Sequence, residues 1–229
     1  MSVIETKNLH KIYQDTKIPV HAVNGIDISF EEGEFTAIVG PSGSGKTTFL
    51  NMVGGLDKPS EGEVLIDGVK VNELKSRKLI DFRLHNIGFV FQAYNLIPVL
   101  TAMENVSFIM QLQGWSKKDR TNRAKELLNE VGIDSDRINN RPGNLSGGQQ
   151  QRVAVARALA SKPKFILADE PTANLDSKST ENLLDIMEKL NKEEKITFIF
   201  STHDARVVKK ARRVITLEDG KILSDEIKE

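Results

Sequence analysis

The chain has 229 residues, enough for one α/β domain with a sizeable buried core. Lysine plus arginine and aspartate plus glutamate both number 32, so the net charge is zero, which disfavours a protein whose main task is to bind nucleic acid. The chain has no cysteine, which excludes disulfides and thiolate metal sites and suits the cytosol. No apolar run approaches the roughly 18 residues of a membrane helix, so we expect a membrane to be reached only through partner subunits.

The first part of the chain predicts antiparallel strands beside a buried strand. Residues 2–9 form the first strand, and a polar loop containing Tyr13 follows it. Apolar and polar residues alternate over 26–30, the period of a half-buried strand, and 35–39 are almost entirely apolar. Residues 63–66 then begin a hairpin that turns at the next Asp-Gly pair.

The middle of the chain, residues 93–161, predicts helices. Thr101 begins a capping box, Ser116 caps a second helix with an i, i+3, i+4, i+7 apolar stripe, and Ser146 begins a second capping box. We interpret this block as a helical subdomain inserted into a larger domain.

Strands and helices alternate again after residue 161, which predicts a parallel sheet covered on both faces. The expected elements are strands at 165–168, 196–202 and 214–217, a helix at 178–190, and a terminal hairpin at Asp219-Gly220. The predicted fold class is therefore α/β, with one domain over 1–229. Residues 1–92 and 162–229 would form a core with a mixed sheet and an N-terminal antiparallel β-subdomain.

A glycine-rich segment between the 35–39 strand and a following helix predicts a binding site for the phosphates of a nucleotide. Its residues are Gly40, Pro41, Ser42, Gly43, Ser44, Gly45, Lys46, Thr47 and Thr48. Glycines let successive backbone N–H groups point at one anion, and the helix N-terminus adds its positive dipole end. Lys46 is expected to reach the β- and γ-phosphates, and the Thr47 hydroxyl to hold Mg²⁺. A chance glycine-rich connection is disfavoured because the lysine, the threonine and both flanking elements are present.

Four polar residues follow predicted strands at the edge where α/β sheets bind ligands. Asp169 would hold Mg²⁺, and Glu170 would orient and polarise the water that attacks the γ-phosphate. Gln92 is a candidate for contact with Mg²⁺ and that water, and His203 for a hydrogen bond to the γ-phosphate. Alone, the Asp-Glu pair would suggest a turn with a helix cap, and the histidine a cap or a solvated loop residue.

A second candidate phosphate site lies about 100 residues after the first. It consists of Ser146, Gly147, Gly148 and Gln149 at a helix N-terminus, where they also form the capping box. Two such sites for one nucleotide make sense if they face each other across a dimer.

In this order and spacing, GPSGSGKTT, Gln92, LSGGQQQR, ILADEP, Asp176 and His203 resemble the ATP-binding cassette (ABC) ATPases over essentially the whole chain. The resemblance implies a P-loop, RecA-like core that binds ATP and Mg²⁺ and hydrolyses ATP. It implies that Tyr13 stacks on adenine, that Ser146–Gln149 close over the γ-phosphate in the opposite subunit, and that Asp176 lies at the dimer seam. Gln92 would join the Mg²⁺ chemistry to a transmembrane partner.

Further segments, such as Leu56–Pro59, Ile87–Gln92 and Asn95–Val106, resemble the lipoprotein-release and macrolide-export group, the LolD and MacB type. This implies an ATP-dependent homodimer at the cytoplasmic face of the membrane, bound to permease subunits, with 93–106 as the docking surface and no nucleic-acid partner. Two alternatives stay open: a cell-division ATPase of the FtsE type working with a membrane partner, and a soluble non-transport ABC ATPase. The second is disfavoured because the chain has no long heptad run and only one phosphate loop.

Overall fold

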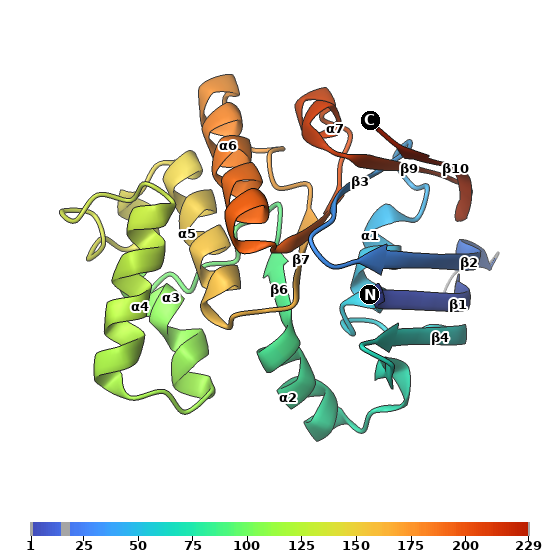
Figure 1. Ribbon diagram of the computed structural model, residues 1–229, viewed down its shortest axis with the longest axis horizontal. Coiled ribbons are helices and arrows are strands. Elements are labelled where there is room, and N and C mark those ends of the chain that lie inside the picture. Colours follow the sequence, from blue (N-terminus) through green and yellow to red (C-terminus); the bar gives the residue numbers. More distant parts are fainter. Residues whose placement is uncertain (1, 15–18, 229) are drawn as a thin grey trace.

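The computed structural model describes residues 2–14 and 19–228, which form two sheets with helices between and beside them (Figure 1). The N-terminal sheet is antiparallel, with the strand order β2-β1-β4-β5. Its strands are β1 (Ser2–Tyr13), β2 (Val20–Glu31), β4 (Glu61–Ile66) and β5 (Val69–Lys70). The prediction that Tyr13 lies in a loop was wrong: Tyr13 is the last residue of β1 and pairs with Val20.

The second sheet has six strands in the order β10-β9-β3-β8-β7-β6. They are β3 (Phe35–Val39), β6 (Ile87–Val90), β7 (Phe165–Asp169), β8 (Thr197–Ser201), β9 (Arg213–Glu218) and β10 (Lys221–Ile227). All pairs are parallel except the hairpin β9-β10, so the sheet is mixed, as predicted. The carboxyl ends of β3, β7 and β8 therefore meet at one edge.

The helix α1 (Lys46–Val53) lies between the two sheets and directly follows the glycine-rich turn. Phe49, Leu50, Met52 and Val53 are at most 2% exposed and pack in one apolar cluster with residues of both sheets. Burial of four large apolar side chains from an eight-residue helix fixes its first turn relative to β3. That first turn is where the phosphate site was predicted.

The other face of the six-stranded sheet is covered by helices, among them α5 (Gly147–Ala160) and α6 (Ser177–Glu194). Side chains of β7 alternate between the two clusters: Leu167 joins the α1 side, and Ile166 and Ala168 join the α5 and α6 side. This alternation explains why the strand is apolar throughout rather than amphipathic.

Helices α3 (Ala102–Leu112) and α4 (Lys117–Glu130) pack against α5 at the side remote from the N-terminal sheet (Figure 1). The capping boxes at Thr101 and Ser146 and the cap at Ser116 are present as predicted. Two helices were missed, α2 (Ser76–Asn86) and α7 (Ala205–Lys210). The first has no fully buried residue, and only Leu79 and Phe82 pack, partly buried, against the apolar cluster around α1, so its helical pattern is weak. The second is only six residues long.

Two short 3₁₀ segments, Val71–Glu73 and Pro142–Asn144, complete the described elements. Within residues 2–14 and 19–228, no helix has the length and apolar character needed to cross a membrane.

Candidate nucleotide-binding site

The glycine-rich turn fits tightly against neighbouring backbone. Gly40 has a φ of 148°, and a Cβ atom there would lie 2.1 Å from the carbonyl oxygen of Leu217. Gly45 has a φ of 98°, and its Cβ would lie 2.0 Å from the carbonyl oxygen of Ala22. Side chains at these two positions would displace backbone on opposite sides, so the turn requires glycine for space as well as for conformation.

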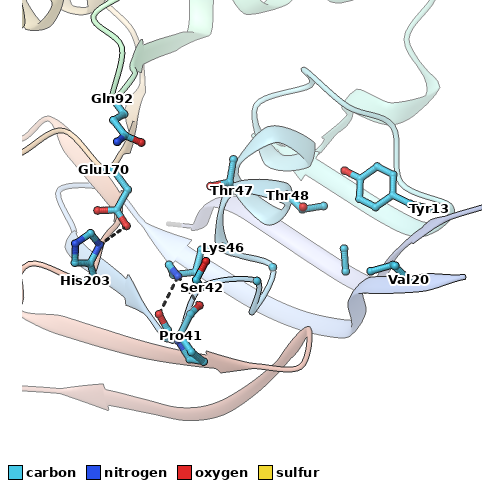
Figure 2. A pocket seen from close by; sticks show the side chains of 14 residues that line it. Tyr13, Val20, Pro41, Ser42, Lys46, Thr47, Thr48, Gln92, Glu170 and His203 are labelled. Atoms are coloured by element: carbon cyan, nitrogen blue, oxygen red, sulfur yellow. Dashed lines mark hydrogen bonds and ion pairs between the residues drawn. The ribbon is translucent and has the colours of Figure 1, made fainter. Parts of the chain in front are cut away.

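Lys46 begins α1 with only 9% of its surface exposed. Its Nζ donates to the carbonyl oxygens of Gly40 at 2.8 Å and Pro41 at 2.9 Å, so the ammonium points back into the turn (Figure 2). Both partners are neutral carbonyls, so the positive charge is not neutralised by a carboxylate there. A phosphate group in the turn would supply that negative charge.

The end of β7 brings a carboxylate to α1. The Thr47 hydroxyl donates to Asp169 Oδ1 at 3.0 Å, although the two residues are 122 positions apart in the sequence. A hydroxyl and a carboxylate are hard oxygen ligands of the kind that Mg²⁺ prefers when substrate phosphates complete its shell. The residues present therefore fit a magnesium ion bound with a nucleotide. Among the residues that the structure describes, no group of three or more acidic, histidine or cysteine side chains is arranged to hold a metal ion by itself.

Glu170 adopts a left-handed backbone conformation, with a φ of 46°, which is rare for a residue other than glycine. Its N–H donates to the Ser201 carbonyl at 2.8 Å, which holds the strained residue to the end of β8. Its side chain is 16% exposed and lies beside His203, whose Nδ1 is 2.9 Å from Glu170 Oε1. Such strain is found where a protein must aim a side chain, and here it aims a carboxylate at the cavity in Figure 2.

One cavity of about 670 Å³ gathers most of the predicted site residues (Figure 2). It is lined by Tyr13, Gly40, Pro41, Ser42, Gly43, Gly45, Lys46, Thr47, Thr48, Gln92, Glu170 and His203, together with Val20 and Ala22. Tyr13 stands at the opposite end of the cavity from His203 (Figure 2). Val20 and Ala22 were missed by the sequence analysis, because apolar side chains on a strand give no signal of a ligand.

Ser44 and Asp169 do not line the cavity, but Ser44 belongs to the glycine-rich turn and Asp169 accepts a hydrogen bond from Thr47. The residues of the second predicted phosphate site and Asp176 lie elsewhere. Ser146 is exposed at the start of α5, and its hydroxyl accepts from the Gln149 N–H at 3.3 Å while Gln149 Oε1 accepts from the Ser146 N–H at 2.9 Å. Asp176 is the N-cap of α6 and accepts two hydrogen bonds from Ser179, which lower the pKa of its carboxyl. Within one copy, the structure thus does not bring these residues to the cavity.

Three further residues connect these groups. Asn174 donates from Nδ2 to the Gln92 carbonyl at 2.9 Å, and its own carbonyl accepts from the Tyr94 hydroxyl at 3.4 Å. Arg157 of α5 donates to the Tyr94 carbonyl at 2.9 Å and to that of Asn95. Burial lowers the pKa of the Arg157 guanidinium. The roles of these residues depend on contacts across 62 to 82 positions of sequence, and the sequence analysis missed them.

A strand, a glycine-rich turn and a helix around one cavity, with Lys-Thr in the turn and an acidic pair after a parallel strand, define a P-loop nucleotide-binding protein. Comparison with known proteins gives the family. Residues 23–173 match the family described as ABC transporter. The chain belongs to this family.

Three relatives show where in the family it falls. The chain is 47% identical to the ABC transporter ATP-binding protein MJ0796 of Methanocaldococcus jannaschii, over 98% of this chain and 97% of that protein. A solved dimeric structure of MJ0796 bound to ADP and Pi has a TM-score of 0.91 at 45% identity, over 98% of each chain. The lipoprotein-releasing ATP-binding protein LolD of Syntrophotalea carbinolica is 42% identical over 96% of this chain and 97% of its own length. The macrolide export protein MacB of Mannheimia succiniciproducens is 45% identical over 98% of this chain but only 35% of its own length.

The chain is therefore an ATP-hydrolysing, ATP-binding subunit of the ABC transporter type, and the predicted resemblance is confirmed. The cell-division and soluble non-transport alternatives are not favoured.

Proposed function

We propose that two copies of this chain close around two ATP molecules, with residues 146–149 of one copy on the γ-phosphate bound by the other. The conformation and exposure of the α5 N-terminus support this proposal. Its backbone is already folded into a capping box, yet Ser146 is exposed and is bonded only within its own turn among the contacts described. A Cβ at Gly147 would lie 2.8 Å from the Tyr94 hydroxyl oxygen, and one at Gly148 would lie 2.7 Å from Ser179 Oγ, so either side chain would require its neighbour to move.

In this proposal the cavity holds ATP with its base at Tyr13 and its phosphates in the 40–48 turn. The ring of Tyr13 is 36% exposed and supplies a flat stacking surface. Thr47, Gln92 and Asp169 would hold Mg²⁺, which when bound neutralises phosphate charge. Lys46 would add a second positive charge at the β- and γ-phosphates.

For hydrolysis we assign Glu170 the role of orienting and polarising the attacking water. An ionised carboxylate only accepts hydrogen bonds, so His203 donates to Glu170 from Nδ1. A histidine that also donates to the γ-phosphate from Nε2 must carry both protons. In this assignment His203 has two roles: its Nε2–H donates to the negatively charged γ-phosphate, and its Nδ1–H holds the Glu170 carboxylate in place.

We also propose that Asp176 lies at the seam between the two copies, and that residues 93–161 form a helical subdomain inserted into the core of 1–92 and 162–229. The support for the subdomain is that α3, α4 and α5 pack on one another beside the sheet. Asp176 is exposed and directly follows the segment that contacts Gln92.

The proposed membrane partner is a permease subunit of the LolD or MacB type, which would place this chain at the cytoplasmic face of the membrane. A groove beside Gln92 supports this docking site, and it is lined largely by apolar side chains such as Leu84, Ile87, Phe89, Phe91, Ile97 and Phe108. Ile80 and Leu112, which are 64% and 55% exposed, extend the apolar surface. The groove overlaps the predicted 93–106 surface at Ile97, whereas Leu96 packs against the chain's own core.

The absence of cysteine allows a clean test of the closed dimer. A Ser42→Cys, Ser146→Cys chain carrying Glu170→Gln should form disulfide-linked dimers when ATP is added and should not form them with ADP. The matched control is Ser42→Cys with Ser116→Cys, because Ser116 also caps a helix and is exposed. Failure of the first pair to crosslink with ATP, or equal crosslinking by the control, would refute the proposed arrangement.

A further inference from the structure

The side chain of Tyr13 is held at its hydroxyl end by a residue outside the cavity lining. The hydroxyl donates to Asp57 Oδ2 at 3.0 Å, across 44 positions of sequence. The other carboxylate oxygen accepts from Lys11 Nζ at 2.6 Å and from the Lys58 N–H at 2.7 Å. Asp57 therefore has a fixed orientation, and burial, which raises its pKa, is outweighed by the hydrogen bonds from Lys11 and Tyr13, which lower it.

The backbone of Asp57 is in turn attached to the helix that follows the phosphate turn. The N–H groups of Leu56 and Asp57 both donate to the Asn51 carbonyl in α1, at 2.8 and 3.1 Å. The N-terminus of the same helix carries Lys46 and Thr47 at the phosphate site. One short helix thus connects the phosphate end of the cavity with the anchor of the aromatic ring at its other end.

Lys11 also limits how the ring can be approached. Its Nζ lies 5.0 Å from the centroid of the Tyr13 ring, within the range of a cation–π contact. The Lys11 side chain is 14% exposed and is bonded to Asp57 and to the Lys58 carbonyl, so it stays on that face. A base would then stack on the opposite face.

We propose that Asp57 is a positioning residue for nucleotide binding, which holds the Tyr13 ring at a set place relative to the phosphate turn so that it is ready to stack on the base. This rests on the proposed stacking role of Tyr13. Without the anchor, the ring must be immobilised when the nucleotide binds, which costs about 0.5–1.5 kcal/mol for one side chain, or roughly a two- to tenfold loss of affinity.

The test compares a ligand that has a base with one that has none. Affinities for Mg-ADP and for magnesium pyrophosphate are measured on the intact chain by calorimetry or competition. Asp57→Ala should weaken ADP about two- to tenfold and leave pyrophosphate unchanged. Tyr13→Phe, which keeps the ring but removes the hydroxyl, should do the same without any risk to the Asp57 loop. The control is Glu63→Ala, which removes a carboxylate about as exposed as that of Asp57 (35% against 30%) from an ion pair with Lys70 in the N-terminal sheet.

A double variant separates positioning from a general effect on the fold. In a chain that already carries Tyr13→Ala, Asp57→Ala should cost nothing further. An unchanged ADP affinity for Asp57→Ala and Tyr13→Phe, or an equal loss for pyrophosphate, overturns the proposed role of Asp57 while leaving stacking intact. An unchanged ADP affinity for Tyr13→Ala itself would instead overturn the stacking proposal on which this one rests.

Discussion

The Nδ1 atom of His203 lies 2.9 Å from Oε1 of Glu170, and this contact joins the ends of β7 and β8 at the rim of the cavity. The two side chains differ greatly in exposure, since that of Glu170 is 16% exposed and that of His203 is 74% exposed. The carboxylate is thus sheltered by the fold, and the imidazole is the member of the pair that is free to meet an incoming group.

Replacement of Glu170 by glutamine should abolish turnover and preserve ATP binding. The amide keeps the size of the side chain but cannot polarise a water molecule, so the steady-state ATPase rate should fall by at least about 100-fold. Gel filtration with ATP should then show a dimer, because the bound ATP is no longer hydrolysed and the closed dimer persists. The control is Glu218→Gln, an exposed glutamate at the end of β9. A monomer for Glu170→Gln with ATP would contradict the scheme.

Lys46→Ala should weaken binding of ATP by about ten- to a hundredfold. The ammonium is buried among neutral carbonyls, and a charged hydrogen bond of this kind is worth about 1.5–3 kcal/mol. Direct titration with a fluorescent ATP analogue measures the loss, with Lys70→Ala, from an exposed ion pair, as the matched control. Equal ATP affinity of the Lys46 variant and the unaltered chain would show that Lys46 does not bind the phosphates.

Asp204 gives the protein a stability that depends on pH at the acid end. A hydrogen bond from Arg206 is the main reason that its pKa is lowered from 3.8 to about 2, and the Thr172 hydroxyl also donates to it at 2.9 Å. Since the folded state has the lower pKa, this stabilisation is complete above about pH 4 and is lost as the pH falls towards 2. It should be on the order of 2 kcal/mol, because the carboxylate is only 13% exposed.

Thermal unfolding from pH 6 to pH 2.5 checks this dependence. Asp204→Asn should be less stable than the unaltered chain at pH 6, and the difference in unfolding free energy should shrink steadily below pH 4. A difference that stays constant over this range would show that ionisation of Asp204 does not contribute.

Gly54→Ala should destabilise the fold by about 1–3 kcal/mol, the usual cost of overpacking. The residue caps α1 with a φ of −79°, which alanine tolerates, but its Cβ would lie 2.2 Å from Cζ of Phe89. The same Cβ would lie 3.0 Å from Cδ1 of Leu167, and a shift of the Phe89 ring would disturb its stacking on Phe91, with centroids 5.5 Å apart. Gly143→Ala is the control, because nothing lies within 4 Å of its Cβ, and its midpoint in denaturant should barely change.

Most of the fold was predictable because local signals agree with it. The capping boxes at Thr101 and Ser146 give the starts of α3 and α5 directly, and the apolar run 35–39 can only be a buried strand. The helix α2 was not predictable, since none of its residues is fully buried and its contact with the core is confined to a few half-buried side chains such as Leu79 and Phe82. Nor was the full length of β1 predictable, because His10 to Tyr13 mix polar and apolar side chains, and this segment is kept extended by pairing with β2.

The site was predictable to the extent that its residues occur in short motifs. Lys46, Asp169, Glu170 and His203 each follow a strand or begin a helix, and the topology brings their elements to one edge. The supporting residues Asp57 and Asn174 were not predictable from the sequence. Each acts through a single side-chain contact between distant segments, Asp57 with Tyr13 and Asn174 with Gln92. The left-handed φ of Glu170 likewise has no signature in an Asp-Glu pair.

The hydrogen bond from Asn174 Nδ2 to the carbonyl of Gln92 has a mechanical consequence. Gln92 follows Phe91, which lines the groove proposed for the permease, and Asn174 is two residues before Asp176. A displacement of the Gln92 backbone would therefore reach the neighbourhood of Asp176 without passing through the nucleotide. In the dimer proposed above, this contact would couple the permease groove of one copy to the opposite copy independently of hydrolysis.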